Sequence, residues 1–119
     1  MNNNSNVETT DQTDIEQLLT IVGQLNRTLR ASIKKEGYDL DGNLLHKFAR
    51  HYFRHQNEDN TLEHLFKLME QAPEKRGNKY VANWRIIRET IKKQEQRFKR
   101  LSTEDLAYVL GWLAKMARA

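Results

Sequence analysis

The sequence contains four histidines, and two of them stand one helical turn apart. His51 and His55 have the spacing of two metal ligands on one helix face. The segment from His51 to His55 reads HYFRH, so it lacks the Glu of an HExxH zinc protease. Arg50 and Arg54 would repel a cation, and His64 could join the pair only if the fold happened to bring it close. We therefore expect no metal and no cofactor.

Arg50 and His55 suggest a second chemistry, the cleavage of RNA without a metal. A His here could act as general base or acid, and an Arg could stabilise the charge of the phosphorane. The spacing resembles the RxxxxH motif of HEPN-type ribonucleases, which are all-helical and need no metal. In that family the motif usually sits on a late helix, whereas here it precedes mid-chain. The ribonuclease stays an alternative interpretation.

The rest of the sequence offers no further catalytic arrangement. It has no Cys, no GxSxG motif and no glycine-rich phosphate loop. The paired carboxylates Asp39/Asp41 and Glu58/Asp59 fall in turn-like segments, where acidic residues are expected for structural reasons. The sequence therefore favours a protein that is not an enzyme.

Hydrophobic periodicity predicts an all-α fold, a single-domain bundle of about five helices. The helices are expected near residues 13–36, 43–56, 61–72, 79–101 and 103–118, and no segment alternates like a strand. A capping box at Thr13 should start the first helix, and Gly37 should end it. The polar residues 1–12 are expected to form a disordered tail, and residues 13–119 the bundle domain.

The expected core follows the apolar stripes of these helices. Gly23 lies inside the first helix, where a close crossing with another helix is one possible reason for it. Tyr52 or Tyr80, if half exposed beside Arg residues, could stack on a base. The residues expected to face the core include Ile15, Leu18, Val22, Phe48, Tyr52, Phe53, Leu65, Tyr80, Trp84, Ile87, Ile91, Phe98, Leu106, Leu113 and Met116, with Trp112 beside them.

Positive charge is concentrated in the second half of the chain. The net charge is +4, but residues 75–100 alone carry ten basic and two acidic residues. A helix over 79–101 would be about 33 Å long, with a positive strip opposite its apolar side. Such clustering favours contact with the phosphates of a nucleic acid. An acidic protein partner, contacted by a helical adaptor, is the other interpretation of this strip.

The C-terminal segment 103–118, TEDLAYVLGWLAKMAR, resembles the last helix of the small subunits of CRISPR effector complexes. There, a capped helix with a Leu-Ala-aromatic opening, a central aromatic and a basic-Ala end closes a helical bundle. A long basic helix precedes it, and before that a Phe/Tyr-rich helix similar to residues 47–53, KFARHYF. The resemblance covers about residues 40–118, and the polar N-terminal tail has no counterpart in it.

The resemblance implies a non-enzymatic subunit that stacks with further copies of itself and with other effector-complex subunits. It would hold a single-stranded nucleic acid or the guide–target duplex by its phosphates, while base pairing supplies the specificity. Whether the target is DNA or RNA stays open. With no apolar run of membrane length and no signal peptide, we expect a cytoplasmic protein with no membrane contact. The residues expected to bind phosphates are Arg85, Arg88, Lys92 and Lys99, then Lys47, Arg50 and Arg54, then Arg27, Arg30 and Lys34.

Overall fold

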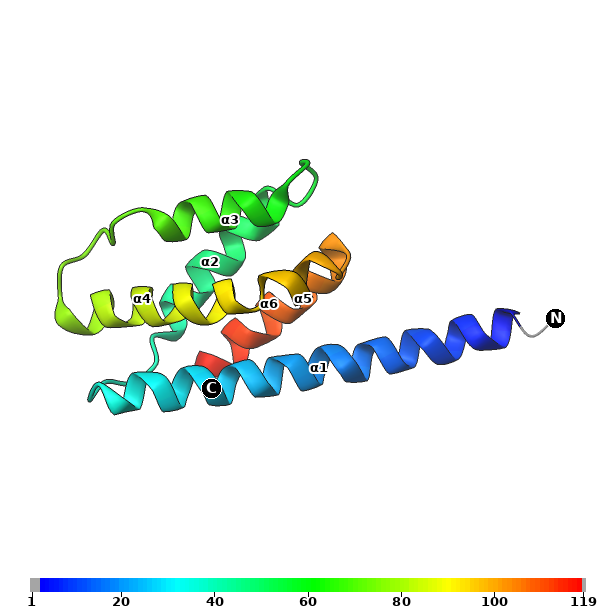
Figure 1. Cartoon of the computed structure of the whole chain (residues 1–119), viewed down its shortest axis with the longest axis horizontal. Coiled ribbons are helices and arrows are strands. Elements are labelled where there is room, and N and C mark those ends of the chain that lie inside the picture. The colour runs from blue at the N-terminus through cyan, green and yellow to red at the C-terminus, as the bar shows by residue number, and fades with distance from the viewer. Residues whose placement is uncertain (1–2, 119) are drawn as a thin grey trace.

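The computed structural model describes the backbone of residues 3–118 and the side chains of residues 15–118. Within that part the chain forms helices and no strand, which confirms the all-α bundle (Figure 1). Helices α1, α2, α3 and α6 correspond to four of the predicted helices, and the predicted helix over 79–101 forms both α4 and α5. The helices are α1 (Asn3–Lys35), α2 (Gly42–Arg54), α3 (Thr61–Glu70), α4 (Asn78–Lys93), α5 (Glu95–Lys99) and α6 (Thr103–Arg118).

The last helix, α6, contacts both α1 and α2, while α4 packs on α1 and α3 (Figure 1). Helices α2 and α6 run antiparallel. Near the end of α2 the Tyr52 hydroxyl donates a hydrogen bond to the carbonyl of Thr103, at the start of α6. At the other end Gly42 lies against Arg118, and a Cβ on Gly42 would come within 2.4 Å of the Arg118 side chain. The close helix crossing is therefore at Gly42. At Gly23 an added Cβ would meet only the Arg27 guanidinium, at 3.6 Å.

The first helix is longer than the sequence predicts. It begins at Asn3, so the capping box expected at Thr13 does not mark its start. Its N-terminal part projects beyond the other helices (Figure 1), and the first buried side chain among the described residues is Leu18. Disorder of the polar segment 1–12 stays a prediction, and its first two residues lie outside the described part. The predicted end is confirmed, since Gly37 adopts φ +87° and its N–H bonds to the Lys34 carbonyl.

The single helix predicted over residues 79–101 is interrupted at Gln94. There the backbone has φ −93° and ψ 8°, and the Gln94 N–H bonds to the carbonyl of Ile91, three residues back. This tighter turn separates α4 from α5, and Phe98 of α5 lies in the core, where it is 1% exposed. The basic surface of this region is therefore not one straight strip.

The core holds most of the predicted apolar stripes, with Val22, Leu65, Ile87 and Leu113 fully buried. Four of the side chains expected towards the core are exposed instead. They are Ile15 (48% exposed), Phe53 (40%), Trp112 (38%) and Met116 (36%). Ile15 precedes Leu18, the first buried side chain of α1 among the described residues, and the other three are only partly covered by neighbouring helices. Among residues 3–118, which the structure describes, no helix is both long and apolar enough to cross a membrane.

Two buried polar contacts fix the position of α4, and neither follows from a local sequence pattern. The Asn83 side chain is fully buried, accepts the Asp41 N–H at 2.7 Å, and donates to the carbonyls of Asp39 and Lys79. This contact ties the α1–α2 loop to α4. The Trp84 indole N–H donates to the Met69 carbonyl at 2.8 Å, satisfying an orphan acceptor at the end of α3.

Candidate nucleic-acid interface

Three of the four phosphate-binding residues predicted on α4 and α5 are paired with nearby carboxylates, and Arg88 is the exception among the described residues. The carboxylates belong to the turn after α1, to α3 and to the strip itself, so they weaken the positive field along α4, although each exposed pair adds little stability. The hydrogen bond from Arg85 to Glu36, at 2.6 Å, also raises the pKa of Arg85. The ion pairs join Arg85 to Glu36 and Glu89, Lys92 to Glu70 and Glu95, and Lys99 to Glu95.

On α1, one of the three predicted phosphate-binding residues has a structural role. The Arg30 guanidinium donates to the carbonyls of Met116, at 3.1 Å, and Ala117, at 3.4 Å. These are carbonyls of the last turn of α6, where a cation is favoured by the helix dipole. Arg27 and Lys34 are exposed and form no ion pair with any residue between 15 and 118.

The exposed face of α2 carries three of the predicted phosphate-binding residues, and one of the three is paired with a carboxylate. Lys47, Arg50 and Arg54 line one shallow hollow together with Asn43 and His46. We call these five residues the α2 basic face. Helix α2 contains no Asp or Glu. The steps of three and four residues place the basic side chains on the same side of the helix.

In the α2 basic face, Lys47 has an acidic partner. Arg50 and Arg54 have none among the described side chains. The Lys47 ammonium is paired with Glu74 in the α3–α4 loop. This contact holds the pKa of Glu74 below its usual value. Arg50 and Arg54 are both exposed, so their guanidinium groups are accessible to a ligand.

An exposed aromatic ring lies beside the α2 basic face. Phe53 is 40% exposed and follows Arg50 by three residues, so the two side chains are neighbours on the helix surface. One edge of the ring faces Gly111 of α6, where a Cβ would be 3.4 Å from the Phe53 Cζ atom. Tyr52, considered from sequence for base stacking, is only 2% exposed, and burial raises the pKa of its hydroxyl.

The structure places Arg50 and His55 in different surroundings. Five residues along an α-helix correspond to a rotation of about 140°, so the two side chains leave α2 in divergent directions. Arg50 lines the hollow of the α2 basic face, whereas the His55 ring contacts Glu58 and stacks on His64. A ribonuclease site within one chain would need both side chains to reach the same phosphate. No contact among residues 15–118 brings the two side chains together.

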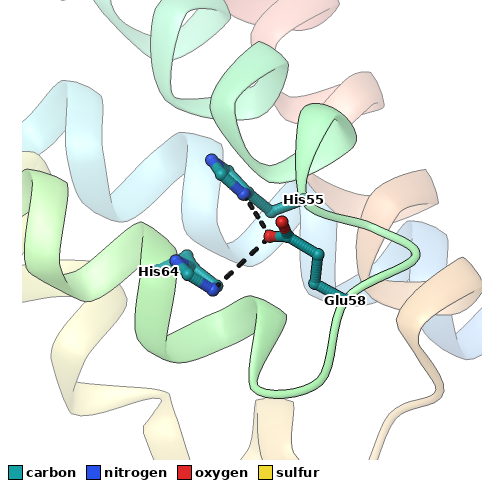
Figure 2. A group of neighbouring side chains, drawn as sticks. All are labelled: His55, Glu58 and His64. Atoms are coloured by element: carbon teal, nitrogen blue, oxygen red, sulfur yellow. Dashed lines mark hydrogen bonds and ion pairs between the residues drawn. The ribbon is translucent and has the colours of Figure 1, made fainter.

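At the turn between α2 and α3 the structure brings together His55, Glu58 and His64 (Figure 2). The sequence pattern did not predict that Glu58 lies between the two histidines. The Glu58 carboxylate accepts a hydrogen bond from His55 Nδ1 and lies 3.5 Å from His64 Nε2. The hydrogen bond with His55 lowers the pKa of Glu58. The His51 ring lies 4.6 Å from that of His55, and the pKa of His51 is lowered, mainly by burial.

The sequence does contain a signal for this cluster. His55 ends one predicted helix, Glu58 lies in the turn, and His64 is one turn into the next helix. Two helices joined by a short turn bring such residues together, because the end of the first helix then lies beside the start of the second.

The resemblance to CRISPR small subunits that the sequence suggests involves segments 47–53 and 103–118, which form parts of α2 and α6, and the long basic helix 79–101, which forms α4 and α5. Helices α2 and α6 pack against each other. Comparison of the chain with models of known protein families, with curated proteins and with solved structures gave no match.

Proposed function

We propose that the protein binds the phosphate backbone of a nucleic acid, without sequence specificity, through the α2 basic face. The observation that carries this proposal is the hollow lined by Lys47, Arg50 and Arg54 on a helix with no acidic residue. Arginine and lysine side chains spaced in this way can follow successive phosphates and release the counterions bound to them. The arginines of this face, together with Phe53, replace the α4 strip as the primary site.

Within this proposal the protein is a non-enzymatic small subunit of a CRISPR-type ribonucleoprotein effector complex. It would contact other subunits and further copies of itself, and specificity would come from base pairing between guide and target. The sequence resemblance over residues 40–118 supports this assignment. A subunit that acts in several copies needs only modest affinity for the strand by itself, because linked copies bind with avidity.

Fluorescence anisotropy with labelled single-stranded RNA, single-stranded DNA and duplex tests the binding site. The test variant is Arg50→Glu/Arg54→Glu, and the charge-matched control is Arg88→Glu/Lys93→Glu on α4. At low salt we expect the α2 variant to lose on the order of tenfold or more in affinity, and the α4 variant to lose clearly less. Equal affinity of the α2 variant and the wild type would refute the proposed face.

The same experiment separates the rival functions. If the protein is a backbone-binding subunit, RNA should remain intact after long incubation. His55→Ala should then bind nucleic acid as tightly as the wild type. Cleavage that disappears in His55→Ala would establish the ribonuclease. Absence of binding to all three probes at any salt would favour a protein adaptor whose basic face contacts an acidic partner.

A further inference from the structure

The turn between α2 and α3 brings together three side chains that suit a metal ion (Figure 2). One ligand atom from each of His55, Glu58 and His64 lies within 4.8 Å of the other two. Two imidazoles and one carboxylate are a ligand set that zinc uses in sites whose fourth position is held by water. We propose that these three residues bind one divalent transition-metal ion, zinc. This site is separate from the α2 basic face and does not depend on the proposed nucleic-acid binding.

One of the distances between ligand atoms is already close to what zinc requires, and the other two must change when the ion binds. With metal–ligand bonds of about 2.0–2.1 Å, two ligand atoms of a tetrahedral site lie about 3.3 Å apart. His64 Nε2 and the nearer Glu58 oxygen are 3.5 Å apart. His55 Nδ1 is hydrogen-bonded to the same oxygen, so the metal would replace the proton that these two atoms share.

Binding also requires a defined change in the two imidazole rings. The rings of His55 and His64 are stacked, with centroids 4.5 Å apart and planes within 10° of parallel. The lone pairs of parallel rings do not point at one atom, so the rings must tilt for both to coordinate the same ion. The three side chains are between 28% and 52% exposed, which leaves them room to do so.

The backbone of the turn is already fixed by hydrogen bonds. The buried Thr61 hydroxyl contacts the carbonyl of His55 at 2.9 Å and that of Glu58 at 2.8 Å. The Glu58 N–H donates to the His55 carbonyl at 3.0 Å, and Asn60 turns the chain with φ 62°. Because the backbone positions of two ligands are set in advance, less conformational entropy is lost when the ion binds.

Both signs of charge occur around the turn. Arg50 and Arg54 both line the hollow of the α2 basic face, and Arg54 precedes His55 in the chain. Glu58 itself, the adjacent Asp59, and Glu63 in the first turn of α3 supply negative charge. Imidazole ligands favour zinc over magnesium or calcium, which prefer oxygen ligands alone.

Isothermal titration of the chelator-treated full chain with zinc chloride at neutral pH tests this site. We expect one zinc per chain, and on the order of tenfold or more loss of affinity in His55→Ala and in His64→Ala. His46→Ala, which removes the His of the α2 basic face, is the matched control and should bind zinc like the wild type. Magnesium chloride should give no heat from this site. Zinc at a hundredfold excess over its Kd should raise the unfolding temperature by roughly 10 °C.

A second measurement on the wild type does not depend on how the variants fold. Zinc should shift the imidazole NMR signals of His55 and His64 and leave those of His46 unchanged. The proposal is overturned if no zinc binds up to about 1 mM. It is equally overturned if zinc binds His55→Ala and His64→Ala as tightly as the wild type.

Discussion

The ammonium of Lys47 on α2 is held by the carboxylate of Glu74 in the loop before α4. This pair removes one of the three positive charges that line the hollow of the α2 basic face. It also links α2 to the loop that carries Lys75 and Arg76, two further exposed basic residues. The acidic partner therefore limits the affinity of this face for phosphate, which can be tested directly.

We predict that Glu74→Gln strengthens nucleic-acid binding, because it frees Lys47 to contact a phosphate. The salt dependence of binding to a single strand should steepen by about 0.7 in the slope of log K against log salt concentration. Anisotropy titrations over a range of salt concentrations measure this slope. Glu104→Gln, a neutralisation of an exposed carboxylate in the first turn of α6, is the control for the change in net charge. Equal slopes for the two variants would show that Lys47 does not reach the bound strand.

Phe53 provides a second prediction, which concerns the form of the nucleic acid. An exposed ring beside basic residues can stack on an unpaired base, and removing such a ring costs about 1–3 kcal/mol per base. We expect Phe53→Ala to weaken binding to single strands and to leave duplex binding nearly unchanged, since paired bases are not available for stacking. Trp112→Ala, which truncates an exposed aromatic side chain on α6, serves as the control. An equal loss for single strands and duplex would exclude a stacking role.

A pair of glycine substitutions tests the packing of α2 on α6. Gly42→Ala places a methyl group against the Arg118 side chain and the Ala117 backbone, and should cost about 1–3 kcal/mol of stability. Gly23→Ala meets no backbone and removes a glycine from the interior of α1, so it should gain about 0.5–1 kcal/mol. Urea denaturation followed by circular dichroism measures both changes. Opposite signs are expected, and a stabilising Gly42→Ala would contradict the close crossing.

Asn83 gives a prediction about the α1–α2 loop. Asn83→Ala leaves the Asp41 N–H and the carbonyl of Asp39 without their partner, which should cost about 1–3 kcal/mol. Asn78→Ala, an exposed position at the start of the same helix, should change stability by less than about 0.5 kcal/mol. Thermal unfolding of the two variants side by side measures the difference. Similar unfolding temperatures would mean that the Asn83 contacts add no net stability.

Most of the fold could be predicted from the sequence, because hydrophobic periodicity and helix-ending residues are local signals. Three features follow from residues that are close together in the chain. They are the buried stripe with Ile87 and Ile91, the end of α1 at Gly37 and the cap of α6 at Ser102. The break at Gln94 has no such local signal, because nothing in its neighbours forbids a continuous helix.

The candidate sites were harder to predict, because they depend on which helices become neighbours. The ion pair of Arg85 with Glu36 and the contact of His55 with His64 both join different helices. A sequence shows that such groups exist but not which of them meet. For the same reason Phe53 was assigned to the core, although the edge of α6 covers only part of its ring.

The position of α6 against both α1 and α2 also determines when the protein can fold. During synthesis α1 and α2 emerge first, yet α6, which packs on both, is made only after α3, α4 and α5. Until then the apolar side chains of α1 and α2 that lie against α6 must remain at least partly exposed to solvent. Folding on the ribosome would therefore be delayed until α6 has left the exit tunnel, and a nascent chain stalled before that point would be prone to aggregation.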